Sequence, residues 1–278
     1  MIGVMTNEDR HNQMAKAIGL FPMLQKRDKF LPRRASIACY GPSLADTWQK
    51  LRRPIITVSG AHDYLVKRGI VPDFHVDCDP RPHKPEMLRK PQKATIYLMA
   101  SVCHPRFWEA LQGRSVRLWH LINGDDLETV AWVAENHPVG IKSMIGGGSS
   151  VGMRAMNVAA ALGYRKFDIH GMDCSFTENR HAGAHTGGKQ VETLVQAGDR
   201  IFKTTKQMLQ AAIEMEHFLK QQDAEIRFYG DGLMQATSKI LRQRDETRNC
   251  GMDERTVHGR NPREKRSLFP SGASAKRF

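Results

Sequence analysis

The chain has 278 residues, of which 40% are hydrophobic and 26% are charged, and its formal net charge at pH 7 is +13. This length and composition suit a folded protein of one large or two small domains with a sizeable core. No apolar run approaches the roughly 20 residues that cross a bilayer, and the first residues lack the pattern of a signal peptide. We therefore expect a cytoplasmic protein with no membrane partner.

The positive charge indicates which ligands the protein attracts, and the cysteines indicate whether a disulfide or zinc site is expected. An excess of lysine and arginine attracts phosphates, nucleotides or nucleic acid through its long-range field. The five cysteines are an odd number and include no CxxC pair. A disulfide scaffold or a zinc site is therefore not expected, and free thiols agree with a reducing cytoplasm.

Predicted strands and helices alternate along the first half of the chain. Residues 7–25 have helical spacing that Pro22 interrupts, and residues 35–41 have the composition of a buried strand that ends in glycine. Further strands are predicted at 54–60, 73–79, 93–101 and 115–122, with helices at 42–52, 61–69 and 124–137.

The second half continues this alternation. A glycine-rich turn opens a helix that ends near residue 163, and it is followed by a strand at 166–173, a long helix at 191–223 and a last strand at 224–230. Such a pattern predicts an α/β fold, Rossmann-like, with a mainly parallel sheet and helices on both faces.

The same pass along the chain predicts three parts. Residues 1–34 form a helical lead-in, residues 35–240 the Rossmann-like domain, and residues 241–278 a basic tail with almost no apolar periodicity. A tail of this composition is expected to be disordered. Its role is either solubility or non-specific contact with nucleic acid.

The first motif of interest follows the strand at 35–41. Gly41, Pro42 and Ser43 end this strand and open a helix, at the end of the sheet where α/β proteins bind ligands. Exposed backbone N–H groups at such a turn form an anion site that Ser43 can extend. The alternative is an ordinary strand-to-helix turn with a serine cap.

The second motif is the glycine-rich turn GGGSSVG. Gly147 and Gly148 allow close approach of a ligand to the backbone, and Ser149 and Ser150 can donate to phosphate or ribose. The turn is neither a GxGxxG fingerprint nor a P-loop, so by itself it is weak evidence for a nucleotide.

The third motif joins a carboxylate to two histidines. Asp173 comes just after a predicted strand, and His181 and His185 follow in a glycine-bearing stretch. The glycines predict a loop, whereas a His-x3-His pair needs a helix to bind metal. Histidines beside a strand-end carboxylate favour acid–base catalysis, and the alternative is a pair of solvated loop histidines.

The fourth motif is a pair of acids at the end of the strand at 73–79. Asp77 and Asp79 are two residues apart, so on a continuing strand their side chains point to the same face. Such a pair can hold Mg²⁺, whose other ligands would be water and polyphosphate oxygens. The alternative is an Asp-Pro turn paired with Arg81 or Lys84.

Taken in order, these motifs resemble a known family. Three stretches carry the resemblance: GPSL, L-x3-GI-x-PD-x3-D-x-D at 65–79, and GGSSVG…IHGMD at 147–173. Together they resemble the 6-hydroxymethylpterin diphosphokinase MptE-like domain, which motility accessory factor proteins share. The resemblance covers approximately residues 35–185. It implies a nucleotide-dependent transferase.

In the form implied by this resemblance, ATP binds across Gly41–Leu44 and the glycine-rich turn, and Mg²⁺ on Asp77 and Asp79 neutralises its phosphates. Diphosphate then passes to a hydroxyl of a small, pterin-like acceptor that Asp173 or His185 orients or deprotonates. Transfer of this kind depends mostly on positioning and electrostatics.

The same landmarks resemble, more distantly, the family 42 sialyltransferases, which use a CMP-sugar. That resemblance implies a general base within His181 to His185, with His185 favoured. Two tyrosines that support the leaving phosphate in that pattern are replaced by Asp168 and Ser175, so CMP departure would need another source of positive charge, such as a metal. A non-catalytic module that binds nucleotide or nucleic acid is the third hypothesis.

Overall fold

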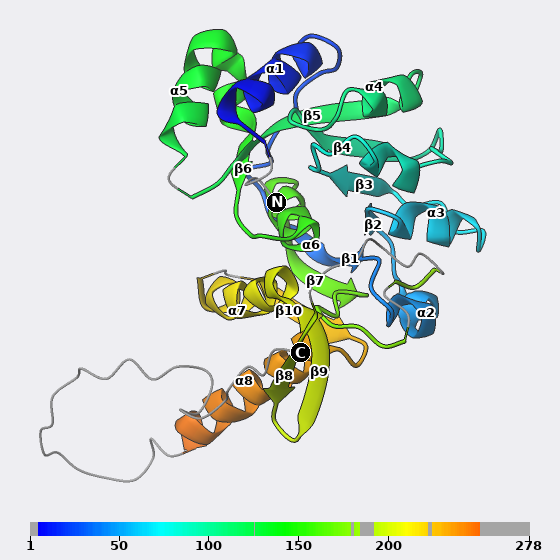
Figure 1. Ribbon diagram of the computed structural model, residues 1–278, viewed down its shortest axis with the longest axis vertical. Coiled ribbons are helices and arrows are strands. Elements are labelled where there is room, and N and C mark those ends of the chain that lie inside the picture. Colours follow the sequence, from blue (N-terminus) through cyan, green and yellow to red (C-terminus); the bar gives the residue numbers. More distant parts are fainter. Residues whose placement is uncertain (1–4, 125, 179–180, 184–191, 222–223, 251–278) are drawn as a thin grey trace, which may run out of the picture.

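The computed structural model describes residues 5–124, 126–178, 181–183, 192–221 and 224–250. Its centre is an eight-stranded sheet in the order β10-β7-β1-β2-β3-β4-β5-β6, in which every neighbouring pair runs parallel (Figure 1). The strands are β1 (Leu31–Ala38), β2 (Ile55–Val58), β3 (Phe74–Asp77), β4 (Ile96–Ala100), β5 (Ser115–Ile122), β6 (Met144–Gly146), β7 (Tyr164–His170) and β10 (Glu225–Tyr229).

Helices lie on both sides of this sheet, as predicted. They are α1 (Asn7–Ala17), α2 (Leu44–Thr47), α3 (Ala61–Val66), α4 (Arg106–Ala110), α5 (Leu127–Asn136), α6 (Val151–Ala161), α7 (Lys206–Gln221) and α8 (Leu233–Cys250), with short 3₁₀ turns η2 (Trp48–Lys50), η3 (Lys84–Met87) and η4 (Pro138–Ser143). Figure 1 shows α2 and α3 on one side of the strands and α6 and α7 on the other. The α/β, Rossmann-like prediction is confirmed.

Continuous apolar runs explain why the central strands form. All four residues of β2 are buried, and so are the last four of β1, because helices cover both faces. On the α6 side, Ile37, Ile56 and Val76 of successive strands are fully buried. Small and flexible residues of α6, including Ala155 and Met156, pack in the same cluster and let the helix approach closely.

The order of the strands creates one special position in the sheet. From β1 the chain adds β2 to β6 in one direction, and α6 then carries it back to β7 on the other side of β1. The chain therefore leaves the carboxyl ends of β1 and β7 in opposite directions. Open parallel sheets bind their ligands at this switch point.

The predicted helix at 191–223 is wrong for its first half. The chain there forms an antiparallel hairpin of β8 (Glu192–Ala197) and β9 (Arg200–Thr205), and α7 begins only afterwards. Gly198 and Asp199 form the two-residue turn, with Gly198 at φ 65°. This is a typical hairpin turn between runs rich in threonine and β-branched residues, and it outweighs the weak helical spacing.

The predicted domain limits differ from the observed elements. Residue 34 falls inside β1, and residue 241 falls inside α8, which continues to Cys250. The rest of the predicted tail, 251–278, lies outside the described residues. In the part of the chain that the structure describes, each helix is too short or too polar to cross a membrane.

Candidate functional site

The turn after β1 and the segment after β7 meet at the switch point. The Ser43 N–H donates to Asp173 Oδ2 at 2.8 Å, and the Ser43 hydroxyl donates to Asp173 Oδ1 at 2.5 Å. Gly41 N–H donates to the Gly171 carbonyl at 2.8 Å. A Cβ on Gly41 would lie 2.4 Å from that carbonyl oxygen, so only glycine fits there. Two of the predicted motifs therefore build one site.

The carboxylate of Asp173 is fully engaged in this arrangement. Besides Ser43, Gln235 at the start of α8 donates its amide to Oδ1 at 3.3 Å. Burial raises the pKa of Asp173, although the hydrogen bonds from Ser43 oppose the rise. The N–H and hydroxyl groups of Ser43 therefore bind an anion of the protein itself, the Asp173 carboxylate. Asp173 positions Ser43 here, and its catalytic role stays a prediction.

His181 lies at the same edge of the sheet, held by Tyr40. The two rings stack with centroids 5.1 Å apart and planes at 7°, and His181 Nδ1 lies 3.3 Å from the Tyr40 carbonyl oxygen. Ala182 N–H donates to the same carbonyl at 3.2 Å. Because Tyr40 directly precedes Gly41, His181 stands beside the switch point. The other predicted base, His185, lies outside the described residues.

Several polar groups of the glycine-rich turn bond within the protein, although the buried Ser149 hydroxyl has no hydrogen-bond partner among the described residues. Ser150 caps α6, because its hydroxyl accepts from the Met153 N–H at 3.3 Å. The Ser149 N–H donates to the Glu214 carboxylate of α7 at 2.7 Å. The nucleotide-binding role predicted for both serines stays a prediction.

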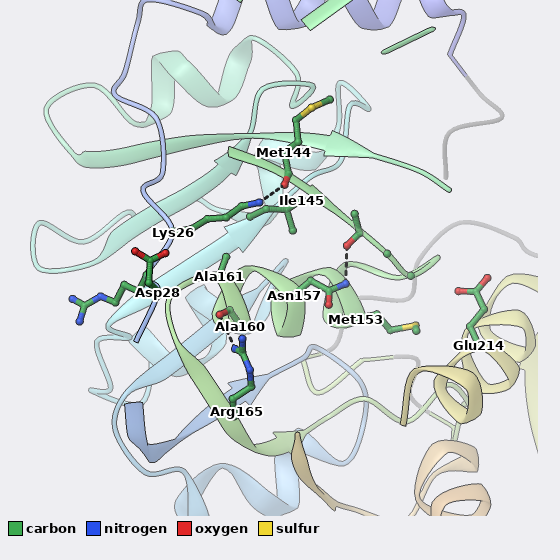
Figure 2. A pocket seen from close by; sticks show the side chains of 14 residues that line it. Lys26, Asp28, Met144, Ile145, Met153, Asn157, Ala160, Ala161, Arg165 and Glu214 are labelled. Atoms are coloured by element: carbon green, nitrogen blue, oxygen red, sulfur yellow. Dashed lines mark hydrogen bonds between the residues drawn. The ribbon is translucent and has the colours of Figure 1, made fainter. Parts of the chain in front are cut away.

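The two glycines of this turn line a groove instead of contacting Ser43. Gly147 and Gly148 have φ of 92° and 80°, which favours glycine. The groove has a volume of about 710 Å³ and runs along α6 (Figure 2). It is lined by Lys26, Arg27, Asp28, Met144, Ile145, Gly146, Gly147, Gly148, Met153, Asn157, Ala160, Ala161, Arg165 and Glu214.

Arg154 of α6 connects the glycine-rich turn to the ends of two strands. Its Nε donates to the Gly148 carbonyl at 2.8 Å, and its Nη2 donates to Asn123 Oδ1 just after β5 at 2.9 Å. Its Nη1 lies 3.6 Å from Cys78 Sγ just after β3. Only 3% of Arg154 is exposed, so a buried cation lies at the carboxyl edge of the sheet.

The two acids at the end of β3 are buried and differ in their partners. Asp77 Oδ1 accepts from the N–H groups of Cys78 and Asp79 at 2.7 and 3.0 Å. Asp79 Oδ1 accepts from Arg81 Nε at 2.9 Å, and Asp79 Oδ2 accepts from Arg81 Nη2 at 2.6 Å. Lys84 Nζ lies 3.4 Å from Asp79 Oδ2. This is the ion-paired Asp-Pro turn that the sequence analysis gave as the alternative to a Mg²⁺ site.

Binding of a magnesium ion by these acids would require a rearrangement of Asp79. Both oxygens of Asp79 are engaged by Arg81, so an ion bound there must first displace the guanidinium. Among the described residues, no three His, Cys, Asp or Glu side chains form a group that could hold a metal ion by themselves. The role of Asp77 and Asp79 as Mg²⁺ ligands stays a prediction, and no chemical step below is routed through a metal.

The sequence analysis did not identify several polar residues of this edge. Arg154 resembles any helical arginine, and Gln235 lies 62 residues from its partner Asp173. Tyr40 had one usable signal, its place directly before GPSL. His170, one residue before Gly171, stacks on Tyr229 at 4.3 Å, and burial lowers its pKa to about 4, so it is neutral at pH 7.

Comparison with known proteins then assigns the family. The model of the family described as 6-hydroxymethylpterin diphosphokinase MptE-like matches residues 10–179. The chain belongs to the MptE-like family. This confirms the resemblance drawn from the ordered motifs. The match includes Ser43, Asp77 and Asp173, whereas Gln235 lies beyond it.

One solved structure shares the fold of this MptE-like protein. The structure of the MAf glycosyltransferase from Magnetospirillum magneticum AMB-1 superposes with a TM-score of 0.59 at 16% identity, over 86% of this chain and 42% of that chain. This chain thus spans about two fifths of that protein's length. At this identity the likeness establishes the fold alone. No curated protein matches the sequence.

Proposed function

We propose that this MptE-like protein is a nucleotide-dependent transferase whose donor binds at the carboxyl edge of the sheet. The observation that carries the proposal is the meeting of the GPSL turn with Asp173 at the switch point, through the two hydrogen bonds of Ser43. The family description names a diphosphokinase, and the structural relative is described as a glycosyltransferase. Both names denote enzymes that transfer a group to an acceptor.

In the leading form, diphosphate passes from ATP to a hydroxyl of a small, pterin-like acceptor. The acceptor oxygen bonds to the β-phosphorus, the bond from that phosphorus to the oxygen of the α-phosphate breaks, and AMP leaves. The hydroxyl proton moves to a nearby base. His181, held on Tyr40 beside the switch point, supplies an imidazole for this proton, and His185 is the second candidate.

The second candidate function is glycosyl transfer, which the description of the structural relative as a glycosyltransferase supports. The CMP-sugar donor comes from the sialyltransferase resemblance. The acceptor oxygen would bond to the anomeric carbon while CMP leaves and the histidine takes the proton. Asp168, which replaces one supporting tyrosine of the sialyltransferase pattern, pairs with Arg34 at 2.9 Å. Ser175, which replaces the other, accepts from the Leu233 N–H at 3.0 Å. Support for a leaving phosphate must therefore come from other side chains.

A thermal-shift screen with product analysis tests the proposal. ATP, CMP and a CMP-sugar are added to the protein with and without Mg²⁺, and release of AMP or CMP is followed with candidate acceptors. A bound donor raises the melting temperature, by about 2–4 °C for each kcal/mol of binding. Ser43→Ala should weaken binding about fivefold, because the turn loses one of its two bonds to Asp173.

Ser115→Ala is the matched control for this screen, since Ser115 begins β5 at the opposite, amino edge of the sheet. It should bind as the wild type does. Stabilisation by ATP with release of AMP selects diphosphate transfer, and stabilisation by CMP with turnover of the CMP-sugar selects glycosyl transfer. If none of the three nucleotides shifts the melting temperature of the wild type, the proposal is wrong.

A further inference from the structure

The segment that follows β3 places basic side chains around the buried acids. Arg81 forms three hydrogen bonds to Asp79, one from its backbone N–H and two from its guanidinium. Lys84 lies against the same carboxylate, with 15% of its side chain exposed. Asp79 is thus held by two cations that reach toward the surface, whereas the Asp77 carboxylate accepts from backbone N–H groups.

The guanidinium of Arg81 has a second edge that Asp79 does not use. Asp79 takes Nε and one hydrogen of Nη2, which leaves both hydrogens of Nη1 and the other hydrogen of Nη2. Within the described part of the chain, Nη1 has no partner, and 35% of the side chain is exposed. This remaining fork matches two oxygens of a phosphate group, while the bond to Asp79 fixes its direction.

Two more cations reach the same strand end from other elements. Arg154 contacts Cys78, the residue between Asp77 and Asp79, and its own bonds go to neutral oxygens of Gly148 and Asn123. Arg106 of α4 donates from Nη1 to the Pro82 carbonyl at 3.2 Å. Two cations therefore contact Asp79, two more contact the neighbouring residues Cys78 and Pro82, and positive side chains outnumber the two carboxylates.

We propose that this cluster is a phosphate site in which Asp79 positions Arg81 and Lys84, and these two side chains bind the donor phosphate in place of a metal ion. The inference rests on the proposed transferase function and names the part of the site that binds the phosphate. An excess of positive charge favours an anion over Mg²⁺. It also supplies the charge stabilisation for a leaving phosphate that Asp168 and Ser175 do not provide.

Isothermal titration of ATP and of CMP into EDTA-treated protein, repeated with Mg²⁺, tests the inference. The wild type should bind one of the two nucleotides in EDTA. Arg81→Met and Lys84→Met should each weaken that binding about tenfold or more, because a charge-assisted hydrogen bond is lost. Arg89→Met is the matched control, since Arg89 is an exposed arginine of the same loop whose Nε donates to the Glu86 carbonyl and, among the described residues, to no carboxylate.

Asp79→Asn separates the positioning role from a metal role. As a positioning residue, Asp79 should matter equally with and without Mg²⁺, and its loss should weaken binding less than the loss of Arg81. Circular dichroism melts check that each variant is folded, and Lys84→Met provides an independent second variant if Arg81→Met is not.

The outcomes separate the inference from the proposed function. One outcome overturns the inference and leaves the transferase proposal standing. In it, the wild type binds a nucleotide only with Mg²⁺, and added Mg²⁺ no longer changes nucleotide binding by Asp79→Asn. The same holds if Arg81→Met and Lys84→Met bind as tightly as Arg89→Met. If the wild type binds neither ATP nor CMP under either condition, both the inference and the proposed function are wrong.

Discussion

Asp77 and Asp79 lie two residues apart and yet have opposite electrostatic environments. Burial raises the pKa of Asp77 to about 6, and nearby Lys84 offsets only part of this rise. Burial also opposes ionisation of Asp79, but the hydrogen bonds from Arg81 outweigh it and lower its pKa. Asp77 is therefore the member of the pair that changes charge near physiological pH.

The raised pKa of Asp77 predicts a specific pH dependence of stability. The folded state binds the Asp77 proton more tightly than the unfolded chain, so this residue lowers the free energy of unfolding as the pH rises from about 4 to about 6, by about 3 kcal/mol. Asp77→Asn keeps an oxygen to accept from Cys78 and Asp79 but cannot titrate. The stability of the variant relative to wild type should therefore increase across this range.

Urea denaturation followed by circular dichroism between pH 4 and pH 7 measures this difference. Asp79 titrates below that window and is common to both proteins, so it does not obscure the comparison. Curves of unfolding free energy against pH that run parallel for wild type and Asp77→Asn would show that Asp77 ionises normally in the folded protein.

Among the elements, α1 contacts the domain through several side chains, one of which is the buried Arg10. Arg10 Nη1 donates to Asp126 at 2.5 Å and to the Thr129 hydroxyl at 2.9 Å, and Asp126 in turn caps α5 through the Thr129 N–H. The predicted lead-in thus packs against the edge of the Rossmann-like domain and is part of it.

Arg10→Met should therefore cost about 3 kcal/mol of unfolding free energy, because Asp126 loses its partner in a mostly buried position. Lys16→Met, on the exposed face of the same helix, should change it by less than about 0.5 kcal/mol. Urea denaturation measures both variants. Equal stability of the two would mean that α1 is not anchored through Arg10.

At this scale the sequence predicted the central strands well. Apolar runs such as PIITVSG are long enough and sufficiently bounded by glycine and proline to identify buried strands. The hairpin of β8 and β9 was missed, because Val195 and Phe202 also fit helical spacing and only the Gly198-Asp199 turn distinguishes the two structures. Short helices such as α2 end earlier than spacing alone indicated.

For the whole molecule, topology made part of the site predictable. Strand ends of a parallel sheet share one edge, so Ser43, Asp77 and Asp173 were expected there, and Ser43 and Asp173 are indeed in contact. The pairing of each group was not predictable, because it depends on residues distant in sequence. Glu214 binds the glycine-rich turn from α7, and Gln235 reaches Asp173 from α8.

The central claim is that the phosphates of a nucleotide bind along this one carboxyl edge. Backbone amide chemical shifts, recorded by NMR during titration with ATP and then with CMP, test it most directly. We expect the perturbed amides to cluster at 40–43, 79–84, 147–150 and 171–175. Perturbations confined to the amino ends of the strands, around Ser115 and Lys166, or no perturbation with either nucleotide, would contradict it.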